Sequence, residues 1–475
     1  MKFNKKLAVA VSGAVLLMAG QIALADSTTD IVDALVSKGV LTEEEGKLIS
    51  KGHESKKKAD GTVAFKDGFK INSGDGKSNF SVNGRIQADY RWFDAPGAPS
   101  QGAATGPETA DTFDIRRAYL TAKGTFRGWM NFEATLDGTN GATLLKYYWL
   151  ETAFSDKLKV RFGQYKMPMG LEQLTSSRFI DFTERDWAAS LAPAVNKGIM
   201  VHGVPTPGVS YAMSVSNGGL LSDSGATAIE TSSGADGKSF NGRATVDVAT
   251  LSGWKESIVH LGAAYGYDQS LPTMGAGAMK LRTNARGTQF FSTASGVFTN
   301  PDANRYGLEN IIAVGPVKFQ AEYASLELSQ TGFSDRKVSA GYAGVSYMLT
   351  GETYASNYKN GIMDRMLPKN NYTGLDGSGW GAWELGLRYS KFDANDFDNA
   401  AGVGAINSTI SSTDVDSYSA GIKWITDPNT RFLLDYVYTD FNKDITGSTG
   451  TAITAAGGPL YNKESAINFR AQFDF

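Results

Sequence analysis

Two segments at opposite ends of the chain alternate strictly between apolar and polar side chains. In residues 80–92 every odd position is polar, and residues 465–475 repeat the pattern and end on Phe475. Successive side chains of a β-strand point to opposite faces, so each segment has one apolar and one polar face. At ~3.3 Å per residue, a tilted strand of this length can cross a bilayer. The apolar positions of the first segment are Phe80, Val82, Gly84, Ile86, Ala88, Tyr90 and Trp92.

A soluble β-sandwich also alternates apolar and polar residues, so the segment length has to decide between the two folds. Many segments run for nine to thirteen residues, whereas globular strands average ~5–6 residues. Aromatic residues also gather at segment ends, as in Tyr90 with Trp92 and Tyr436 with Tyr438, which is typical of the interfacial girdles of membrane barrels. No apolar run of ~18 residues follows the N-terminal segment, so no transmembrane helix is predicted.

Sixteen such segments predict an all-β fold, a 16-stranded antiparallel transmembrane β-barrel. Short and long connections alternate between them, and an even count places both chain ends on one side. One connection, 350–379, is long where the alternation asks for a short turn. Sixteen strands leave a water-filled lumen, whereas eight fill their own interior. The segments lie near 79–92, 112–124, 129–136, 145–154, 157–165, 198–204, 208–217, 238–249, 258–267, 304–314, 317–329, 335–349, 380–392, 415–425, 429–440 and 464–475.

The first 25 residues have the features of a secretory signal peptide. Three lysines precede the apolar run 7–18, and an A-L-A sequence at 23–25 provides a small-residue cleavage site. The alternative is an uncleaved membrane anchor, for which the run is short. Cleavage after Ala25 would leave 43 basic and 49 acidic side chains, a net charge of −6, which argues against nucleic-acid binding.

Residues 26–60 predict a short helical periplasmic segment and linker ahead of a barrel domain at 61–475. Thr42 and Glu45 have the spacing of a capping box for a second short helix, and Gly39 ends the first helical pattern. The Lys-rich stretch 53–60 has the composition of a linker. Either an oligomerisation element or a merely tethered helix is compatible with this segment.

Several motifs together resemble one known family. Residues 161–172 read R-F-G-Q-Y-K-M-P-M-G-L-E, followed by S-S-R at 176–178, E-R at 184–185, L-T-G-E at 349–352 and G-A-W-E-L at 381–385. These sequences resemble the phosphate-selective porin O and P family over nearly the whole mature chain. The resemblance implies a homotrimer of sixteen-stranded barrels, each narrowed by an inward loop and lined by Arg and Lys. The long loop 166–197 after the fifth strand is then the expected constriction.

Diffusive passage of an anion needs cationic side chains where fields are focused, spaced so that they attract without trapping. Arg suits oxyanions because its guanidinium binds them in a bidentate fork. Arg116 and Arg117 are adjacent, so a bulge is needed to turn both inward. Arg388 and Arg470 are further lumen candidates. The predicted anion path comprises Arg85, Arg116, Arg117, Lys159, Arg161, Lys166, Arg178 and Arg185.

Lumen cations also occur in barrels without anion preference, because they pair with nearby acids. The same loop carries Glu172, Asp181, Glu184 and Asp186. The expected function is therefore an outer-membrane porin for small anions, phosphate or other oxyanions among them. The alternative is a general or a cation- or sugar-permeable porin without anion selectivity.

The sequence disfavours two other classes of protein, enzymes and TonB-dependent transporters. An enzyme would need a nucleophile, metal or phosphate-loop motif, but the chain has no cysteine and only three histidines, His53, His202 and His260. A TonB-dependent transporter needs ~22 strands and a plug domain, for which 26–78 is too short. No cofactor is expected, and the expected partners are small anions and outer-membrane lipid.

Overall fold

The computed structural model describes residue 32 and residues 35–49, 61–65, 68–94, 111–139, 144–193, 195–218, 237–271, 279–293, 298–375, 377–397, 411–446 and 460–475. The predicted signal peptide and the predicted linker 53–60 lie outside these ranges. Within them, no helix is both long and apolar enough to cross a membrane.

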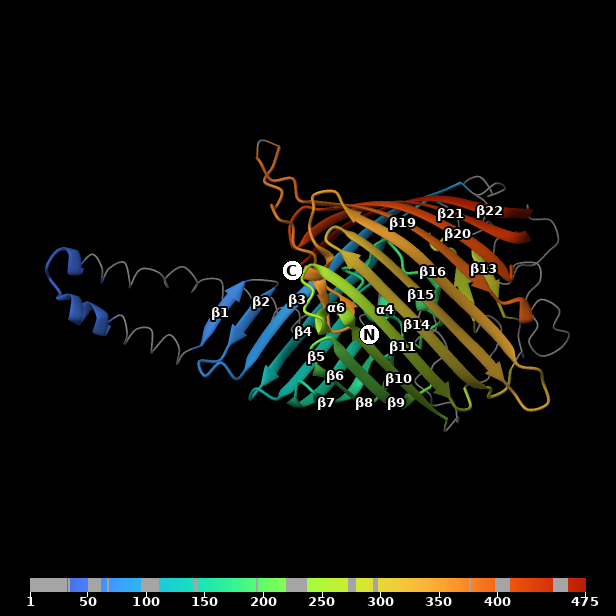
Figure 1. Ribbon diagram of the computed structural model, residues 1–475, viewed down its shortest axis with the longest axis horizontal. Coiled ribbons are helices and arrows are strands. Elements are labelled where there is room, and N and C mark those ends of the chain that lie inside the picture. Colours follow the sequence, from blue (N-terminus) through green and yellow to red (C-terminus); the bar gives the residue numbers. More distant parts are fainter. Residues whose placement is uncertain are drawn as a thin grey trace, which may run out of the picture. The chain divides into compact units, whose positions relative to one another are not determined.

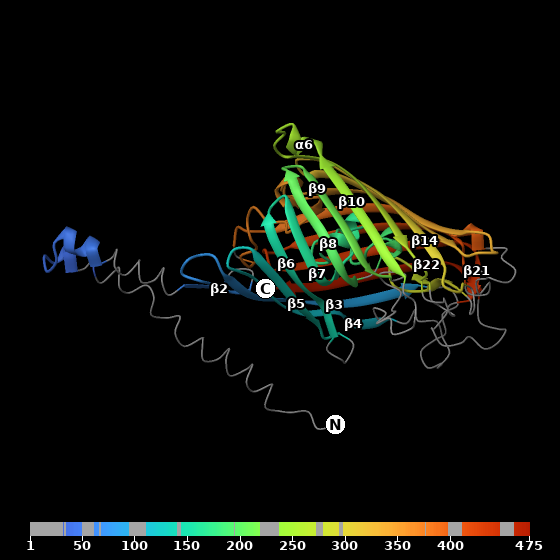
Figure 2. The ribbon, with the colours of Figure 1, turned by 90° about the horizontal axis from the view of Figure 1, so that it is seen from below.

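Sixteen long antiparallel strands form a closed barrel, which confirms the predicted fold class (Figures 1 and 2). The last strand pairs with the first, with Ala471 opposite Ala88, and Ser81 Oγ donates to the Lys123 carbonyl on the second strand at 3.3 Å. Each predicted segment coincides with one of these strands. They are β3 (Asn79–Asp94), β4 (Thr112–Phe126), β5 (Met130–Asp137), β6 (Leu144–Ser155), β7 (Leu158–Lys166), β8 (Val195–Thr206), β9 (Val209–Asn217), β10 (Lys238–Asp247), β11 (Ser257–Asp268), β14 (Asp302–Val314), β15 (Val317–Ser329), β16 (Arg336–Met348), β19 (Ala382–Asp393), β20 (Asp414–Ile425), β21 (Thr430–Thr446) and β22 (Leu460–Asp474).

Side chains alternate between the outside and the inside of the barrel, and the outward side chains are predominantly apolar. On β19, Leu387 and Tyr389 are exposed, while Arg388 between them is buried. The same alternation recurs on β22, where Phe469 and Phe473 are outward and Arg470 is buried. An outward surface of this kind is stable only against lipid, so the alternation itself accounts for the membrane barrel.

The strand β10 ends two residues earlier than predicted. The pattern at 238–249 was expected to remain extended, but β10 ends at Asp247 and a helical turn α6 (Val248–Leu251) follows. The Asp247 carboxylate caps this turn by accepting hydrogen bonds from the Ala249 and Thr250 backbone amides. Alternation alone cannot detect such a cap, because the side chains of one helical turn still read as apolar and polar.

The strand count is right at the one connection that broke the alternation of lengths. Residues 349–381 join β16 to β19 at the end of the barrel where the other connections are short, as between β14 and β15. This segment contains a 3-10 turn η2 (Tyr354–Asn357) and a hairpin of β17 (Tyr358–Lys359) and β18 (Ile362–Met363). The long connection is therefore a folded element, and its described residues contain no further strand of the barrel.

The N-terminal part forms a unit by itself, composed of residues 1–64 and 70–80. Its described helix, 43–49, has the predicted capping box: the Thr42 amide donates to Glu45 Oε2 at 2.9 Å and the Glu45 amide donates to Thr42 Oγ1 at 3.2 Å. The first helical segment ends at Gly39, whose φ is 70°. Two short strands, β1 (Thr62–Phe65) and β2 (Phe69–Asn72), were not predicted.

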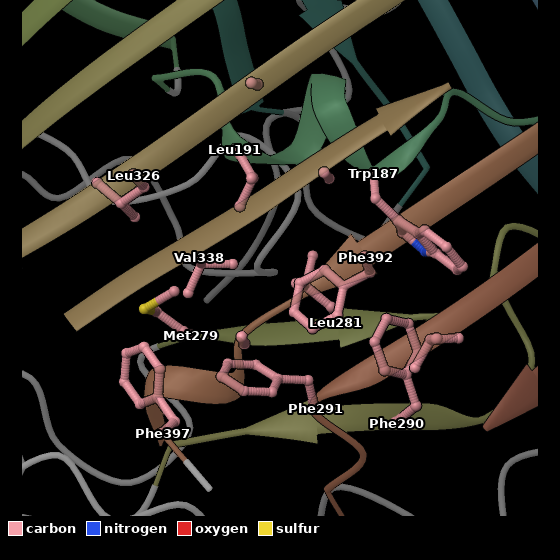
Figure 3. Close-up of a cluster of buried hydrophobic side chains, with 14 of the residues drawn as sticks. Trp187, Leu191, Met279, Leu281, Phe290, Phe291, Leu326, Val338, Phe392 and Phe397 are labelled. Carbon is pink, nitrogen blue, oxygen red and sulfur yellow. The ribbon is translucent and has the colours of Figure 1, made fainter. Parts of the chain in front are cut away.

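A hydrophobic cluster lies inside the barrel, against β15, β16 and β19 (Figure 3). It joins a short helix α5 (Trp187–Leu191) to a hairpin of β12 (Lys280–Arg282) and β13 (Gln289–Ser292), and to η3 (Asn395–Phe397). The Trp187 ring lies 5.2 Å from Phe290 and 6.2 Å from Phe392, both edge to face. This part of the interior is thus filled by side chains.

Candidate functional site

The loop between β7 and β8 crosses the barrel interior. On one side, Arg85 Nη1 on β3 donates to Ser177 Oγ at 2.8 Å. On the other, Lys318 Nζ on β15 binds both Asp181 oxygens at 2.7 Å. Since β3 and β15 are far apart around the barrel, residues 167–193 span the lumen. We call this segment the inner loop.

The local sequence explains how the inner loop keeps its shape. Gly170, whose φ is 78°, precedes a short helix α4 (Leu171–Leu174). The Asp186 carboxylate caps α5 by accepting from the Ala188 amide at 2.9 Å, and Trp187 Nε1 donates to the Arg282 carbonyl at 2.8 Å. The loop is therefore fixed by a glycine turn, a cap and a buried aromatic side chain rather than by strand pairing.

A cavity of about 620 Å³ remains between the inner loop and the wall formed by β3 to β10. Its lining is mostly polar and basic, and includes Thr121 and Thr135 from the wall and Ser176 from the loop. A space of this size and chemistry holds water. All eight residues of the predicted anion path line this one cavity: Arg85, Arg116, Arg117, Lys159, Arg161, Lys166, Arg178 and Arg185.

Four of these eight cations are paired with carboxylates. Their nearest contacts are Arg116 with Glu184 at 2.7 Å, Arg161 with Glu151 at 2.6 Å, Lys159 with Asp156 at 3.6 Å and Arg178 with Asp474 at 3.5 Å. A paired cation contributes little net field to the cavity, because the carboxylate lies within a few ångströms.

The other four, Arg85, Arg117, Lys166 and Arg185, have no carboxylate within 4.0 Å among the described residues. Neutral groups hold them in place. Lys166 Nζ donates to the Gln173 carbonyl at 2.6 Å, and Arg185 donates to the Glu172 and Thr175 carbonyls at 2.7 Å. Arg117 Nη1 donates to Gln87 Oε1 at 2.8 Å. We call these four residues the uncompensated cations.

An aromatic ring lies against one of the uncompensated cations, Arg85, and against the neighbouring Lys146. The Arg85 guanidinium lies 4.3 Å from the centre of the Tyr119 ring, and Lys146 Nζ lies 5.0 Å from the same ring. The strongest charge interactions of Lys166 are with Arg185, Arg85, Arg117 and Lys146, all cations. The positive charge is therefore concentrated where the inner loop meets the wall.

Glu184 forms the negative edge of the site. Although burial alone would raise the pKa of the Glu184 carboxyl, the guanidinium of Arg116, with those of Arg286, Arg117 and Arg470, holds this pKa well below its usual range. Glu184 therefore stays ionised and ties the inner loop to Arg116 and, at 3.1 Å, to Arg470. Glu184 thus anchors the loop and partly offsets the charge of Arg117, but among the described residues it forms no ion pair with any of the four uncompensated cations.

Arg388 and Arg470 are inward, as expected, but they hold the loop instead of lining the cavity. Arg470 Nε binds Asp89 at 2.6 Å, and Arg388 Nη1 donates to the Glu184 carbonyl at 3.3 Å. Arg116 and Arg117 both reach the interior, as the predicted bulge requires: Ile115 and Leu120 are outward, so the alternation changes parity between them.

Sequence reasoning missed several lining residues. Lys146 escaped because the pairing of β5 with β6 shifts register at Thr135 and Leu136, which reverses the expected faces of the neighbouring residues. His202, whose Nε2 lies 2.8 Å from Glu151, and Arg243, which donates to the Gly361 carbonyl at 2.6 Å, also line the cavity. Both sit on inward positions of correctly predicted strands, so the alternation of inward and outward positions could have identified them.

Residues 349–369 close much of the barrel at the short-turn end. Tyr354, Met363 and Met366 are buried among Ile258 and Ile311 of the wall. The hairpin tip reaches the cavity, where Asn360 and Ile362 contribute to the lining. Among the described residues, this cavity lies on the side of β3 to β10. The described residues contain no group of three His, Asp or Glu side chains placed to hold a metal ion.

Comparisons with known proteins agree with this geometry. Porin O of Pseudomonas aeruginosa is 27% identical over 419 residues, covering 82% of this chain and 90% of that protein. An uncharacterised protein of Caulobacter vibrioides is 26% identical over 389 residues, covering 80% and 72%. Among solved structures, OprB of Pseudomonas putida has a TM-score of 0.50 at 10% identity, covering 84% of this chain and 95% of that one.

The family comparison spans the whole barrel. Residues 80–475 match the family described as phosphate-selective porin O and P. This match begins within β3 and ends at the C-terminal residue, so it includes the inner loop and all eight cations. The chain therefore belongs to the phosphate-selective porin O and P family and is a porin of the bacterial outer membrane.

Proposed function

We propose that the cavity conducts small inorganic anions, with oxyanions such as phosphate as the preferred class. The observation that carries this proposal is the set of uncompensated cations, Arg85, Arg117, Lys166 and Arg185, facing one water-filled space. The mature net charge of −6 gives no global attraction for anions, so preference has to come from this local field.

The arrangement suits transient binding. Each uncompensated cation already donates hydrogen bonds to neutral oxygens, as Lys166 does to the Gln173 carbonyl, so its position is fixed before an anion arrives. An anion replaces water beside such groups at little reorganisation cost. Because the cations come from β3, β4, β7 and the inner loop, an anion can pass from one to the next without a closed cage.

Further assignments follow from the family and from the pattern of connections. We infer that residues 1–25 are a cleaved signal peptide, that 26–60 is periplasmic, and that 166–197 is the constriction of the 61–475 barrel. The short-turn end faces the periplasm, as in outer-membrane barrels generally. We also propose that the protein works as a homotrimer and has no catalytic role.

Planar-bilayer recording tests the anion preference. Under a salt gradient, the reversal potential should have the sign of an anion-selective channel, and added phosphate should block chloride current at low concentration. A reversal potential of the opposite sign would establish the alternative, a cation-permeable or general porin. Anion selectivity without block by phosphate would support the anion path and contradict the preference for phosphate.

A further inference from the structure

An arm of residues 370–381 leaves the barrel at the short-turn end, between the β17–β18 hairpin and β19. Its backbone closes on itself, with the Thr373 amide bonded to the Gly379 carbonyl at 3.4 Å and the Gly381 amide bonded to the Asn370 carbonyl at 3.1 Å. We propose that this arm dips its tip, Leu375, into the phospholipid leaflet at this end of the barrel.

The arm is fixed to the lipid-facing side of the wall, not to the lumen. The Trp380 carbonyl accepts from Nε1 of Trp383 at 3.2 Å and from Nε1 of Trp424 at 2.8 Å. Trp383 and Trp424 are register partners on β19 and β20. Lys423 and Ile425, the neighbours of Trp424, are buried on the lumen side, so Trp424 points outward.

Tyr372 fixes the start of the arm at the same place. Its amide donates to the Thr426 carbonyl at 2.7 Å, and its ring lies 5.1 Å from the Trp424 ring, edge to face. The arm is thus attached at both ends, through Tyr372 and Trp380, to the same outward aromatic residues. This leaves the stretch between them, which contains Leu375, as the projecting part.

The arm continues an aromatic row that already faces lipid. Trp383 stacks on Trp424 at 5.2 Å, Trp424 on Phe432 at 5.6 Å, and Phe432 on Phe469 at 6.3 Å. Rows of this kind lie at the membrane–water interface, where Trp is favoured. An element bonded to the end of the row is therefore held at the depth of the lipid headgroups.

Two apolar side chains of the arm are exposed. Leu375 is 100% exposed and Trp380 is 70% exposed. Burial in the adjacent leaflet removes this apolar surface from water. A second copy of the chain is the competing occupant, but the closed backbone of the arm offers no free strand edge to it. Continuity with the aromatic row favours lipid.

The absence of cysteine from the chain makes a direct test available. Leu375→Cys in the full mature protein carries a single polarity-sensitive fluorophore, and the labelled barrel is reconstituted into phosphatidylethanolamine–phosphatidylcholine vesicles with brominated acyl chains. The emission should be blue-shifted and strongly quenched by the bromines. The matched control is Asp156→Cys, in another short turn with a side chain 95% exposed, whose label should stay aqueous and unquenched.

Two outcomes would overturn the proposal. A label at residue 375 that matches the Asp156→Cys control in emission and quenching would place the arm in water. A blue-shifted label that the bromines do not quench, together with oxidative cross-linking of Leu375→Cys between copies, would assign the arm to a protein contact. Heat-modifiable gel mobility equal to that of the parent protein shows in every case that the barrel has folded.

Discussion

Opposite walls of the same barrel carry different kinds of inward side chain. The wall from β3 to β10, which we call the open wall, presents Arg117, Lys159, Arg161 and His202 to the cavity. The wall from β14 to β16, which we call the packed wall, presents apolar residues at many equivalent positions. These include Ala303, Ile311, Ala313, Leu326, Leu328, Val338, Ala340 and Met348, all buried.

The difference lies in what each wall faces. The packed wall is covered by α5, by the β12–β13 hairpin and by residues 349–369, so its inward face is a protein core. The open wall faces water and keeps polar side chains. We therefore propose that this barrel conducts beside the open wall, which supplies the charges, while the packed wall fixes the inner loop.

The largest expected effect comes from loosening the packed wall. Trp187→Ala removes the aromatic side chain that packs on Phe290 and Phe392, and truncations of this kind cost ~3–5 kcal/mol. We expect higher single-channel conductance, noisier current and weaker anion preference, because the inner loop no longer holds its position. Trp254→Ala, in an exposed turn, should leave conductance unchanged. Parental conductance for Trp187→Ala would show that the cluster does not position the loop.

A smaller but more specific effect is expected at the open wall. Lys166→Gln removes one uncompensated charge, which at ~10 Å and an effective dielectric constant of ~20 changes the energy of an anion by ~1–2 kcal/mol. The anion-to-cation permeability ratio should therefore fall by about tenfold, and further in Lys166→Glu. The reversal potential measures this ratio.

The matched control for Lys166→Gln removes charges of both signs. In the double variant Lys159→Gln with Asp156→Asn, one paired cation and its partner are lost together. The permeability ratio should stay at the parental value, since the net charge of the cavity is unchanged. If the double variant lost as much anion preference as Lys166→Gln, pairing with a carboxylate would not explain which cations set the selectivity.

Much of the open wall could be predicted from sequence, because its strands obey strict alternation. Arg85, Lys159 and Arg161 were placed inward by parity alone, and the structure brings them to one cavity. Parity fails only where register shifts, as it does near Lys146 at the irregular pairing of Thr135 and Leu136. The bulge on β4 could be predicted because its outward residues change parity between Ile115 and Leu120. Residues 147–150 of β6 are aromatic or apolar at every position, so no change of parity is visible near Lys146.

The packed wall was harder to predict for a different reason. Inward positions such as Leu326 and Val338 are apolar, whereas Glu322 on the same face of β15 is charged. The inward face is therefore mixed, and nothing local indicates what covers it. The covering hairpin, β12 with β13, lies in a long connection where no element was predicted. The connection 350–379 did carry a signal, since its length broke the alternation, but its fold depends on contacts distant in sequence, such as Tyr358 with His260 at 2.7 Å.

The stability of the inner loop around Glu172, between the two walls, should depend on pH. Burial, with the Asp186 charge opposing that of Arg388, raises the pKa of Glu172 to about 7. A raised carboxyl pKa stabilises the native packing fully below the ordinary value of about 4.5 and progressively less as pH rises through about 7. Hydrogen exchange of the α4 amides, corrected for intrinsic rates, should accelerate between pH 5 and pH 8. Glu172→Gln should abolish this acceleration, and persistence of the acceleration would assign the titration to another group.

The smallest effect is expected where a cation of the open wall is paired at the surface. Asp156 is 95% exposed and lies 3.6 Å from Lys159. Charges beside bulk solvent act through a dielectric constant of ~80, so at ~10 Å one of them changes the energy of an anion by ~0.4 kcal/mol. Lys159→Gln alone should therefore change the permeability ratio less than about threefold, and the difference should vanish at 1 M salt, where the screening length is ~3 Å. Lys166→Gln should keep more of its effect under the same conditions, because Lys166 is enclosed by the inner loop. If both variants lost their effect equally with salt, enclosure by the inner loop would not protect the charge of Lys166.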